Sequence, residues 1–542
     1  MRGVSFLLIG LACCTTLAHA GDYDVVVYGG TSAGVTAAIQ VKRMGKSVVL
    51  IEPSEHIGGL TSGGLGHTDS GNKTVIGGLS REFYQRVKKH YDDEKNWTTD
   101  KRSTFATYRA SEDTMWVFEP HIAEKILLDM LKEAKVDVVM NERLLRMDNG
   151  LAFKDKAIVS LTTMNSKLYR AKMFIDATYE GDLMALAGVS YTVGREANKT
   201  YGESMNGVAK AWNKFSHRFT VDVDPYVKPG DPKSGLLSTI EKDLPAEGEA
   251  DQRVQAYCFR MCLSNDPANQ LPFAKPADYD EKRYELLLRN FEAGDKRFGF
   301  LPFALDKMPN KKTDSNNNGP FSTDNIGMNY DYPEASYSKR EAIIKEHLSY
   351  QQGLMWTLAN HPRVPKQTKD KMKLWGLPKD EFTDNGGWSH QLYIREARRM
   401  VGAYVHTELD CTRKRETPTP IGMGSYNMDS HNITRYVTKA GFVQNEGDVQ
   451  EKPGGPYPIA YGSIIPKDGQ CPNLLVPVCV SSSHIAYGSI RMEPVFMILG
   501  QSAATAACLA LDDDTSVQKL DTAKLTKRLL DDKQVLKFEP KK

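Results

Sequence analysis

The sequence contains few cysteines, and they do not form the spacing that holds an iron–sulfur cluster. None of its eight cysteines belongs to a C-x-x-C run, whereas such a cluster needs about four organised thiolates. We therefore expect no iron–sulfur cluster, and we predict no metal-ligating residues elsewhere. Cys258 and Cys262 would lie one turn apart in a helix. A disulfide between them and a set of free buried thiols both remain open.

The sequence also lacks an excess of either charge and, after its first residues, any long apolar run. Its 70 Lys and Arg balance 68 Asp and Glu, which excludes the strongly basic surface that nucleic acid or an anionic membrane attracts. After the N-terminal segment, the sequence predicts no stretch that is long and apolar enough to span a membrane. We expect a small-molecule substrate as partner, with no nucleic acid and no membrane span.

The N-terminus has the features of a secretory signal peptide. Arg2 precedes an apolar core from Val4 to Ala12, and the small residues of Ala18-His19-Ala20 suit cleavage after Ala20. We expect an exported protein, periplasmic or secreted. The alternative is a lipoprotein signal acylated at Cys13 or Cys14, against which Gly10 stands where a larger apolar residue is usual.

The rest of the chain is organised around residues 24–66. Three valines, a Gly29-Gly30 turn and a helical pattern follow one another without a linker, which predicts a strand, a tight turn and a helix. Gly29 allows the turn, Gly34 allows the helix to pack on the strand, and the first helical amides are free for a pyrophosphate. Thr31 stands at the middle glycine of the G-x-G-x-x-G pattern, so its side chain must point away from the phosphates.

Two features after this helix favour FAD over NAD. A second apolar run ends on Glu52, where a carboxylate can bond a ribose. A second glycine-rich loop, HIGGLTSGGLG at residues 56–66, then follows. A nicotinamide domain has no need of this loop, whereas a flavin lies along backbone that must approach closely.

Two later motifs extend the pattern: DATYEGD at residues 176–182 and GSIRMEP at residues 488–494. With residues 24–66 they make the chain resemble the FAD-dependent oxidoreductase family with a glutathione-reductase-like FAD-binding domain, as an exported bacterial-type member. The resemblance implies FAD as cofactor. It implies cofactor contacts at Gly29, Thr31, Ser32, Ala33, Gly34, Glu52, Pro53, Gly58, Gly59, Leu60, Thr61, Leu144, Ala177, Thr178, Gly181, Asp182, Met492 and Glu493.

The length of 542 residues indicates two domains. We expect an α/β fold in which a Rossmann-like FAD-binding domain is interleaved with an α+β substrate domain. The predicted boundaries are a signal peptide at 1–20, FAD-binding segments at 21–190 and 405–512, a substrate or cap domain at 191–404 and a C-terminal helix at 513–542. Within the first FAD-binding segment, residues 157–164 and 168–175 predict a β-hairpin meander.

The substrate domain contains three segments of note. Apolar residues at helical spacing predict a helix from Lys339 to Leu358. The polar stretch Asn310–Asp324 reads either as a solvated loop or as part of a pocket for a hydroxylated substrate, with Tyr330, Tyr332 and Trp388. Residues 390–408 have helical periodicity, with Arg395, Glu396 and Arg399 as an ion network or an anion clamp.

Residues near the expected flavin ring are the candidates for catalysis. Leu474–Val480 predicts a last buried strand, and His484 and Arg491 flank a turn before a helix that starts at Pro494. The positive end of that helix would face the flavin. His67, after the second glycine loop, is a candidate proton-transfer group or covalent flavin anchor, and the alternative for both histidines is a purely structural role.

Three functions fit these observations. The first is an exported FAD enzyme that transfers a hydride between flavin and a small polar substrate, such as a sugar or hydroxy acid, with an unknown electron acceptor. The second is a redox-neutral flavin lyase or hydrolase acting on polysaccharide-derived sugars. The third is a carbohydrate-binding protein with a vestigial FAD site.

Overall fold

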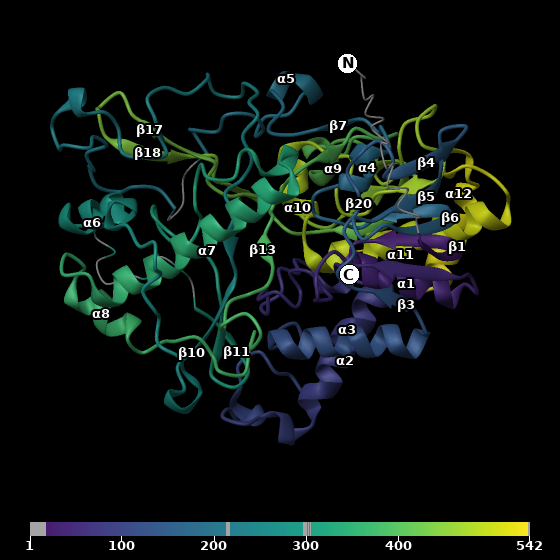
Figure 1. Ribbon diagram of the computed structural model, residues 1–542, viewed down its shortest axis with the longest axis horizontal. Coiled ribbons are helices and arrows are strands. Elements are labelled where there is room, and N and C mark those ends of the chain that lie inside the picture. The colour runs from purple at the N-terminus through teal and green to yellow at the C-terminus, as the bar shows by residue number, and fades with distance from the viewer. Residues whose placement is uncertain are drawn as a thin grey trace, which may run out of the picture.

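A seven-stranded sheet forms the centre of one half of the molecule, on the right in Figure 1. The computed structural model describes residues 18–212, 217–295, 297, 301, 303 and 305–539. The strand order is β3-β2-β1-β6-β5-β4, and β21 also pairs with β6. The parallel strands are β1 (Ala18–Tyr28), β2 (Val48–Ile51), β3 (Asp137–Val139), β6 (Lys167–Asp176) and β21 (Leu474–Leu475). The antiparallel pair of β5 (Ala157–Thr162) and β6 is the hairpin that the sequence predicts, and β4 (Leu151–Lys154) adds a third strand that was not predicted.

Strand β1 lies in the middle of the sheet because both of its faces are apolar. Val25 and Val27 belong to the large core that also contains α1 (Ser32–Arg43), whereas Val26 and Tyr28 belong to the core on the other face. All four are at most 2% exposed. This two-sided burial is typical of a parallel strand in a doubly wound sheet.

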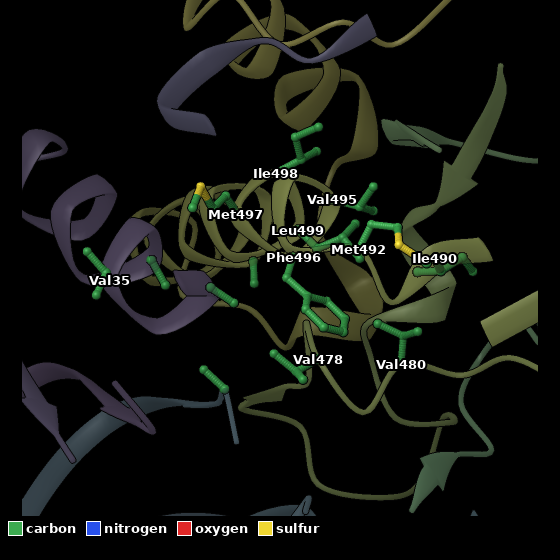
Figure 2. Close-up of a cluster of buried hydrophobic side chains, with 14 of the residues drawn as sticks. Val35, Val478, Val480, Ile490, Met492, Val495, Phe496, Met497, Ile498 and Leu499 are labelled. Carbon is green, nitrogen blue, oxygen red and sulfur yellow. The ribbon is translucent and has the colours of Figure 1, made fainter. Parts of the chain in front are cut away.

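Helix α11 (Glu493–Asp512) packs beside α1 and is the central helix of this core. Figure 2 shows Phe496 of α11 directed toward Val478 and Val480. Gly500 permits the close approach of the two helices, because a Cβ there would lie 2.2 Å from the carbonyl oxygen of Ala33. Contrary to the sequence expectation, this helix is long and apolar enough to span a membrane, but 89% of that window is buried inside the protein, as expected of a core helix.

Three more long helices pack in the first half. They are α2 (Gly78–Asp92), α3 (Pro120–Ala134) and α12 (Thr522–Asp531). Pro120 occupies the first turn of α3, where its missing N–H costs nothing. Both α2 and α12 contact α11.

The second half, on the left in Figure 1, has its own core around α7 (Tyr337–Asn360). Helix α7 covers the whole segment predicted as helical. It is joined by α6 (Glu285–Glu292), α8 (Lys366–Met372), a sheet of β10 (Met261–Ser264), β12 (Lys312–Ser315) and β11 (Asp306–Met308), and a sheet of β18 (Val443–Glu446), β17 (Thr434–Val437) and β8 (Ile240–Glu241). A Rossmann-type α/β part with an α+β part confirms the predicted fold class.

The segment 390–408 is not the predicted helix. It contains only the short strands β13 (Leu392–Tyr393) and β14 (Arg399–Met400) before the one-turn helix α9 (Glu408–Cys411). The pair between Glu396 and Arg399 does form, but it is buried and part of a tertiary network. The arginines are therefore held by partners from other segments rather than by helical neighbours.

Two further expectations are corrected near the C-terminal end. The predicted strand 474–480 is reduced to the two residues of β21, and the predicted turn at His484 is the helix α10 (His484–Ile490), capped by Ser483. At the other end of the chain, β1 starts at Ala18, so cleavage after Ala20 would shorten its first end. Most of the predicted signal peptide lies outside the described residues.

Candidate active site

The turn between β1 and α1 has the form of a pyrophosphate cradle. Gly29 has φ +103°, and a Cβ on Gly34 would lie 1.8 Å from the carbonyl oxygen of Gly29, so the helix can approach the strand only with glycine there. The Thr31 hydroxyl donates to the Ala177 carbonyl (2.7 Å) and accepts from the Gly34 amide (3.3 Å). The hydroxyl at the middle glycine position is thus engaged by the protein, which leaves the start of α1 open to an anion.

Glu52 stands at the edge of this cradle. Its carboxylate accepts from the amides of Gly30 (2.6 Å) and Ser54 (2.7 Å) and is 9% exposed. Burial raises the pKa of Glu52, while these hydrogen bonds act in the opposite direction. The carboxylate is held in one orientation where a ribose could meet it.

A cleft of about 200 Å³ opens beside these residues. Of the predicted cofactor contacts, its walls contain Gly29, Thr31, Glu52, Pro53, Thr178 and Asp182. The cleft also contains Tyr28, whose hydroxyl accepts from the buried Leu144 amide (2.9 Å). This brings predicted cofactor residues of four separate segments to one place.

Asp182 also takes part in an ion network in the cleft wall. Its carboxylate accepts from Arg340 (2.6 Å) and Arg398 (2.7 Å), and these cations hold the pKa of Asp182 down against its burial. The acid therefore belongs to an ion network in the cleft wall. Gly181 precedes it with φ +68°, a conformation that favours glycine.

The second glycine loop is joined to α1 and α11 by a buried carboxylate. Glu493 accepts from the hydroxyls of Ser32 (2.6 Å), Thr61 (2.7 Å) and Tyr179 (2.8 Å). Tyr179 also accepts from the Leu60 amide (2.9 Å). Three predicted cofactor residues, Ser32, Thr61 and Glu493, therefore meet, and Tyr179, which the sequence did not indicate, ties them together.

Of the remaining predicted cofactor residues, Gly58 and Gly59 lie against residues of the cleft wall. Gly58 pairs with Thr31, and a Cβ on Gly59 would lie 2.4 Å from the Tyr179 hydroxyl. Ala33, Ala177 and Met492 are buried, with Met492 directly before α11. The turn after β1 and the second glycine loop both have positions that admit only glycine, and they lie beside the fixed carboxylate of Glu52 and the free start of α1. This arrangement fits the pyrophosphate and ribose of FAD.

Beyond Thr61, the second glycine loop is covered by the other half of the molecule. Ser389 donates to the Gly63 carbonyl (2.6 Å), and a Cβ on Gly64 would lie 2.5 Å from the carbonyl oxygen of Arg260. The amide of His67 donates to Asp314 (3.0 Å). The residues that face the predicted flavin end therefore come from both halves.

Three buried arginines surround the ring of Tyr393. The guanidinium carbons of Arg260, Arg395 and Arg491 lie 5.8, 4.3 and 5.7 Å from its centroid, and Arg491 donates to its hydroxyl (2.8 Å). Each arginine is at most 4% exposed. Each also keeps one nitrogen without a partner, namely Nη1 of Arg260 and Nε of the other two. Unpaired buried donors are costly, so this group is suited to bind the oxygen atoms of a ligand.

Three aspartates balance this charge. Asp314 holds Arg260 through both carboxylate oxygens (2.7 and 2.6 Å), Asp324 lies 3.0 Å from Arg395, and Asp429 lies 3.1 Å from Arg491. Asp314 and Asp324 belong to the polar stretch that the sequence left open between loop and pocket. The structure buries both acids, whereas Tyr332 lines the FAD cleft and Trp388 belongs to the second core.

His431 forms a dyad with Asp324 at the edge of this arginine cluster. Its Nδ1 lies 2.8 Å from Asp324 and its Nε2 lies 3.6 Å from Asp429. Burial would raise the pKa of Asp324, but Arg395 and His431 hold it at about 2. Burial, with Arg395, lowers the pKa of His431. A neutral imidazole beside an ionised carboxylate is the usual arrangement of a general base.

Of the three residues predicted as catalytic, Arg491 has its side chain in the arginine cluster. His67 reaches that cluster only through its backbone amide, which bonds to Asp314. His484 begins α10, with Nδ1 2.8 Å from Glu396 and Nε2 3.1 Å from the hydroxyl of Ser430. Since both of its ring nitrogens are engaged, His484 is placed to orient its neighbours.

The sequence analysis did not identify Tyr393 or His431 as site residues. Only the arginine-rich stretch 390–408 indicated that an anion could bind in this region. Arg395 was considered there as an anion clamp. Asp324 and His431 lie 107 positions apart, so no local pattern could pair them. The six cysteines of the described chain are all buried and free, which decides between the two states left open for Cys258 and Cys262.

One group of side chains resembles a metal site but holds a lysine. Oxygen and nitrogen atoms of Glu119, His121 and Glu381 lie within 4.8 Å of one another. The ammonium of Lys312 lies 2.8 Å from Glu119 and 2.7 Å from Glu381. A cation is therefore already supplied by the chain.

The chain was compared with curated proteins, solved structures and protein families. No protein of curated function matches the sequence. Among solved structures, the chain is similar to OxyS anhydrotetracycline hydroxylase from Streptomyces rimosus (13% identity, 42% of this chain and 39% of that one, TM-score 0.22). It is also similar to L-proline dehydrogenase from P. horikoshii (19% identity, 33% of this chain and 59% of that one, TM-score 0.24). A third similar structure is L-amino acid deaminase from Proteus vulgaris (17% identity, 33% of this chain and 53% of that one, TM-score 0.23).

The match to these structures spans less than two thirds of each of them. The family described as FAD dependent oxidoreductase, by contrast, matches residues 24–529. Its match includes the cradle, both glycine loops and the arginine cluster. The chain belongs to the FAD-dependent oxidoreductase family.

Proposed function

We propose that this oxidoreductase transfers a hydride between FAD and a small hydroxylated substrate, a sugar or a hydroxy acid. The observation that carries this proposal is the cluster of Tyr393, three arginines and the Asp324–His431 dyad behind the second glycine loop. When bound, FAD supplies the acceptor or donor of the hydride. The residues of the chain have to bind the substrate oxygens and move one proton.

The arginine cluster is the binding part of this proposal. Arg260, Arg395 and Arg491 each have a free nitrogen, and Tyr393 has a hydroxyl that accepts from Arg491 and can donate its own proton. Burial raises the pKa of Tyr393, and Arg491 lowers it. Such a group of donors stabilises a hydroxyl, carbonyl or carboxylate oxygen where water is excluded.

His431 is the proton-transfer part. Its neutral Nε2 takes the hydroxyl proton of the substrate as the adjacent carbon loses a hydride, and Asp324 stabilises the imidazolium that results. In the reverse direction the same imidazolium returns the proton. Because burial and Arg395 lower the pKa of His431, its imidazole stays neutral at a lower pH than that of a free histidine.

An anaerobic screen tests the proposal. FAD-loaded protein is mixed with sugars and hydroxy acids, and loss of the flavin absorbance is followed. A substrate should bleach the parent protein, and His431→Gln should keep its FAD while the bleaching rate falls by about two to four orders of magnitude, the usual contribution of a general base. A parent that no hydroxylated compound bleaches, or a His431→Gln variant with parental rates, would refute it. Bleaching that reverses within each turnover would indicate the redox-neutral alternative.

We also propose that the protein is exported. The support is the charged, apolar and small-residue pattern of residues 1–20. Mass spectrometry of protein recovered from outside the cytoplasm should find a chain that begins at Gly21. An intact N-terminus on protein from the cytoplasm would contradict this.

A further inference from the structure

A second cavity, of about 330 Å³, lies in the other half of the molecule and shares no wall residue with the FAD cleft. Its walls combine apolar side chains with polar ones: Leu237, Leu286, Phe321, Met328 and Tyr350 with Ser238, Thr239, Asn325, Glu346, Lys282, Arg283 and Arg435. This volume is in the range of small-molecule sites, and the mixture of apolar walls with a few polar groups is typical of them.

Arg435, in the wall of this cavity, is a buried cation without an ionic partner. It lies on the middle strand of its three-stranded sheet and is 4% exposed. Its Nη1 lies at 3.5 Å from the Thr239 hydroxyl, and its guanidinium lies 4.9 Å from the ring centroid of Phe321. In the described part of the chain it forms no salt bridge, and its Nε and Nη2 have no partner. Burial lowers its pKa.

The other buried arginines of this protein show what such a guanidinium usually binds. Arg260 holds the carboxylate of Asp314 with its Nε (2.7 Å) and Nη2 (2.6 Å). These two nitrogens form one edge of the guanidinium and match the two oxygens of a carboxylate. Arg435 has the same edge without a carboxylate. The edge is closed to solvent, so a ligand in the cavity would reach it by a small rotation of the guanidinium.

The rest of the cavity suits the same ligand. Asn325 contributes a buried side-chain amide, which lies near the carboxylate of Glu346. Lys282 is exposed at the wall, and Arg283 is paired with Glu346 (2.6 Å), so the net charge of the charged wall residues is positive. Phe321 and Tyr350 offer aromatic faces to an apolar body.

We propose that this cavity is a binding site for a small organic carboxylate, whose two oxygens are held by Nε and Nη2 of Arg435 and whose apolar body packs on Phe321 and Tyr350. The site is separate from the FAD cleft, and it does not depend on the proposed hydride transfer. A carboxylate there would pair the one charge that folding leaves buried and unpaired in this wall.

Calorimetric titration of the FAD-loaded protein tests the site. The probes are benzoate and butyrate, with benzamide as the neutral match of benzoate. We expect saturable binding of at least one carboxylate and none of benzamide. Arg435→Met should weaken carboxylate binding at least tenfold, and Arg435→Lys should not restore it, because an ammonium has no two-pronged edge. Lys282→Met is the control at the exposed part of the wall. It should weaken carboxylate binding only a few-fold, and added salt should suppress this difference.

A stability measurement separates this role from a structural one. If Arg435 is retained for binding, Arg435→Met removes an unpaired buried charge, and the variant should unfold at a higher temperature than the parent without ligand. Added carboxylate should raise the unfolding temperature of the parent and not that of the variant. The proposal fails if neither carboxylate binds the parent, if Arg435→Met binds it equally well, or if that variant unfolds at a lower temperature.

Discussion

Gly34 is the residue whose replacement should separate cofactor binding from folding most clearly. In Gly34→Ala the new Cβ would lie 1.8 Å from the carbonyl oxygen of Gly29, whereas real Cβ contacts essentially never fall below 3.0 Å. The Cβ is fixed to the backbone of α1 and the oxygen belongs to the backbone of the turn, so neither can rotate away. Helix α1 and the turn must therefore move apart by more than an ångström. Overpacking of this kind costs about 1–3 kcal/mol of stability. A charge-assisted hydrogen bond lost from the pyrophosphate weakens FAD binding by a further tenfold to hundredfold, or about 1.5–3 kcal/mol.

The assay is the ratio of flavin to protein after gel filtration at decreasing concentration, with the unfolding temperature measured on the same samples. Gly45→Ala is the control at the opposite end of α1, because Gly45 has φ +77° and nothing within 4 Å of an added Cβ. We expect Gly34→Ala to elute folded and colourless, and Gly45→Ala to keep its FAD. A yellow Gly34→Ala with parental retention would show that the first turn does not carry the pyrophosphate.

Three further outcomes follow from the structure, two at the site and one in the core. Glu52→Gln should lose FAD on dilution where the parent retains it, because the carboxylate in the cleft wall is neutralised while one amide acceptor remains; equal retention would remove Glu52 from the ribose site. Arg491→Met should keep FAD but slow anaerobic flavin reduction by about two to three orders of magnitude, since a cation beside a developing charge contributes about 2–4 kcal/mol; stopped-flow rates near the parental value would make it structural. Burial lowers the pKa of His406 from 6.5 to about 4. Between these pH values the unfolded chain binds a proton at His406 that the folded chain does not bind. The free energy of unfolding is therefore unaffected by His406 above pH 6.5 and falls as the pH decreases toward 4. At pH 5 this costs about 2 kcal/mol, and urea unfolding at pH 8 and pH 5 should show that much less acid sensitivity in His406→Phe; identical sensitivities would mean that His406 is not neutral in the fold.

The cofactor half of the molecule was predictable because its signals are local in sequence. The strand, turn, helix and acid of residues 24–52 lie within thirty positions, and each residue type there is required by its backbone or by the anion. Gly29 and Gly34 illustrate this, since their positions leave no room for any other residue. The family resemblance implied that Ser32, Thr61 and Glu493 each contact the cofactor. Their contact with one another was not predicted, because the chain returns to this place after more than four hundred residues.

The arginine cluster was not predictable, and residues 390–408 show why. Their spacing is compatible with a helix, and local propensity would favour one. Arg395, Arg398 and Arg399 instead bond to Asp324, Asp182 and Glu196, each from a different segment. A buried ion pair is stable only when its partner is present, since an unpaired charge in the interior costs several kcal/mol. Tertiary partners therefore decide the backbone of this stretch, and a single sequence does not show which acid will meet which arginine. The same reasoning distinguishes Arg435 from the other buried arginines described here: among them it is the one for which folding supplies no carboxylate, and a ligand remains the only source of one.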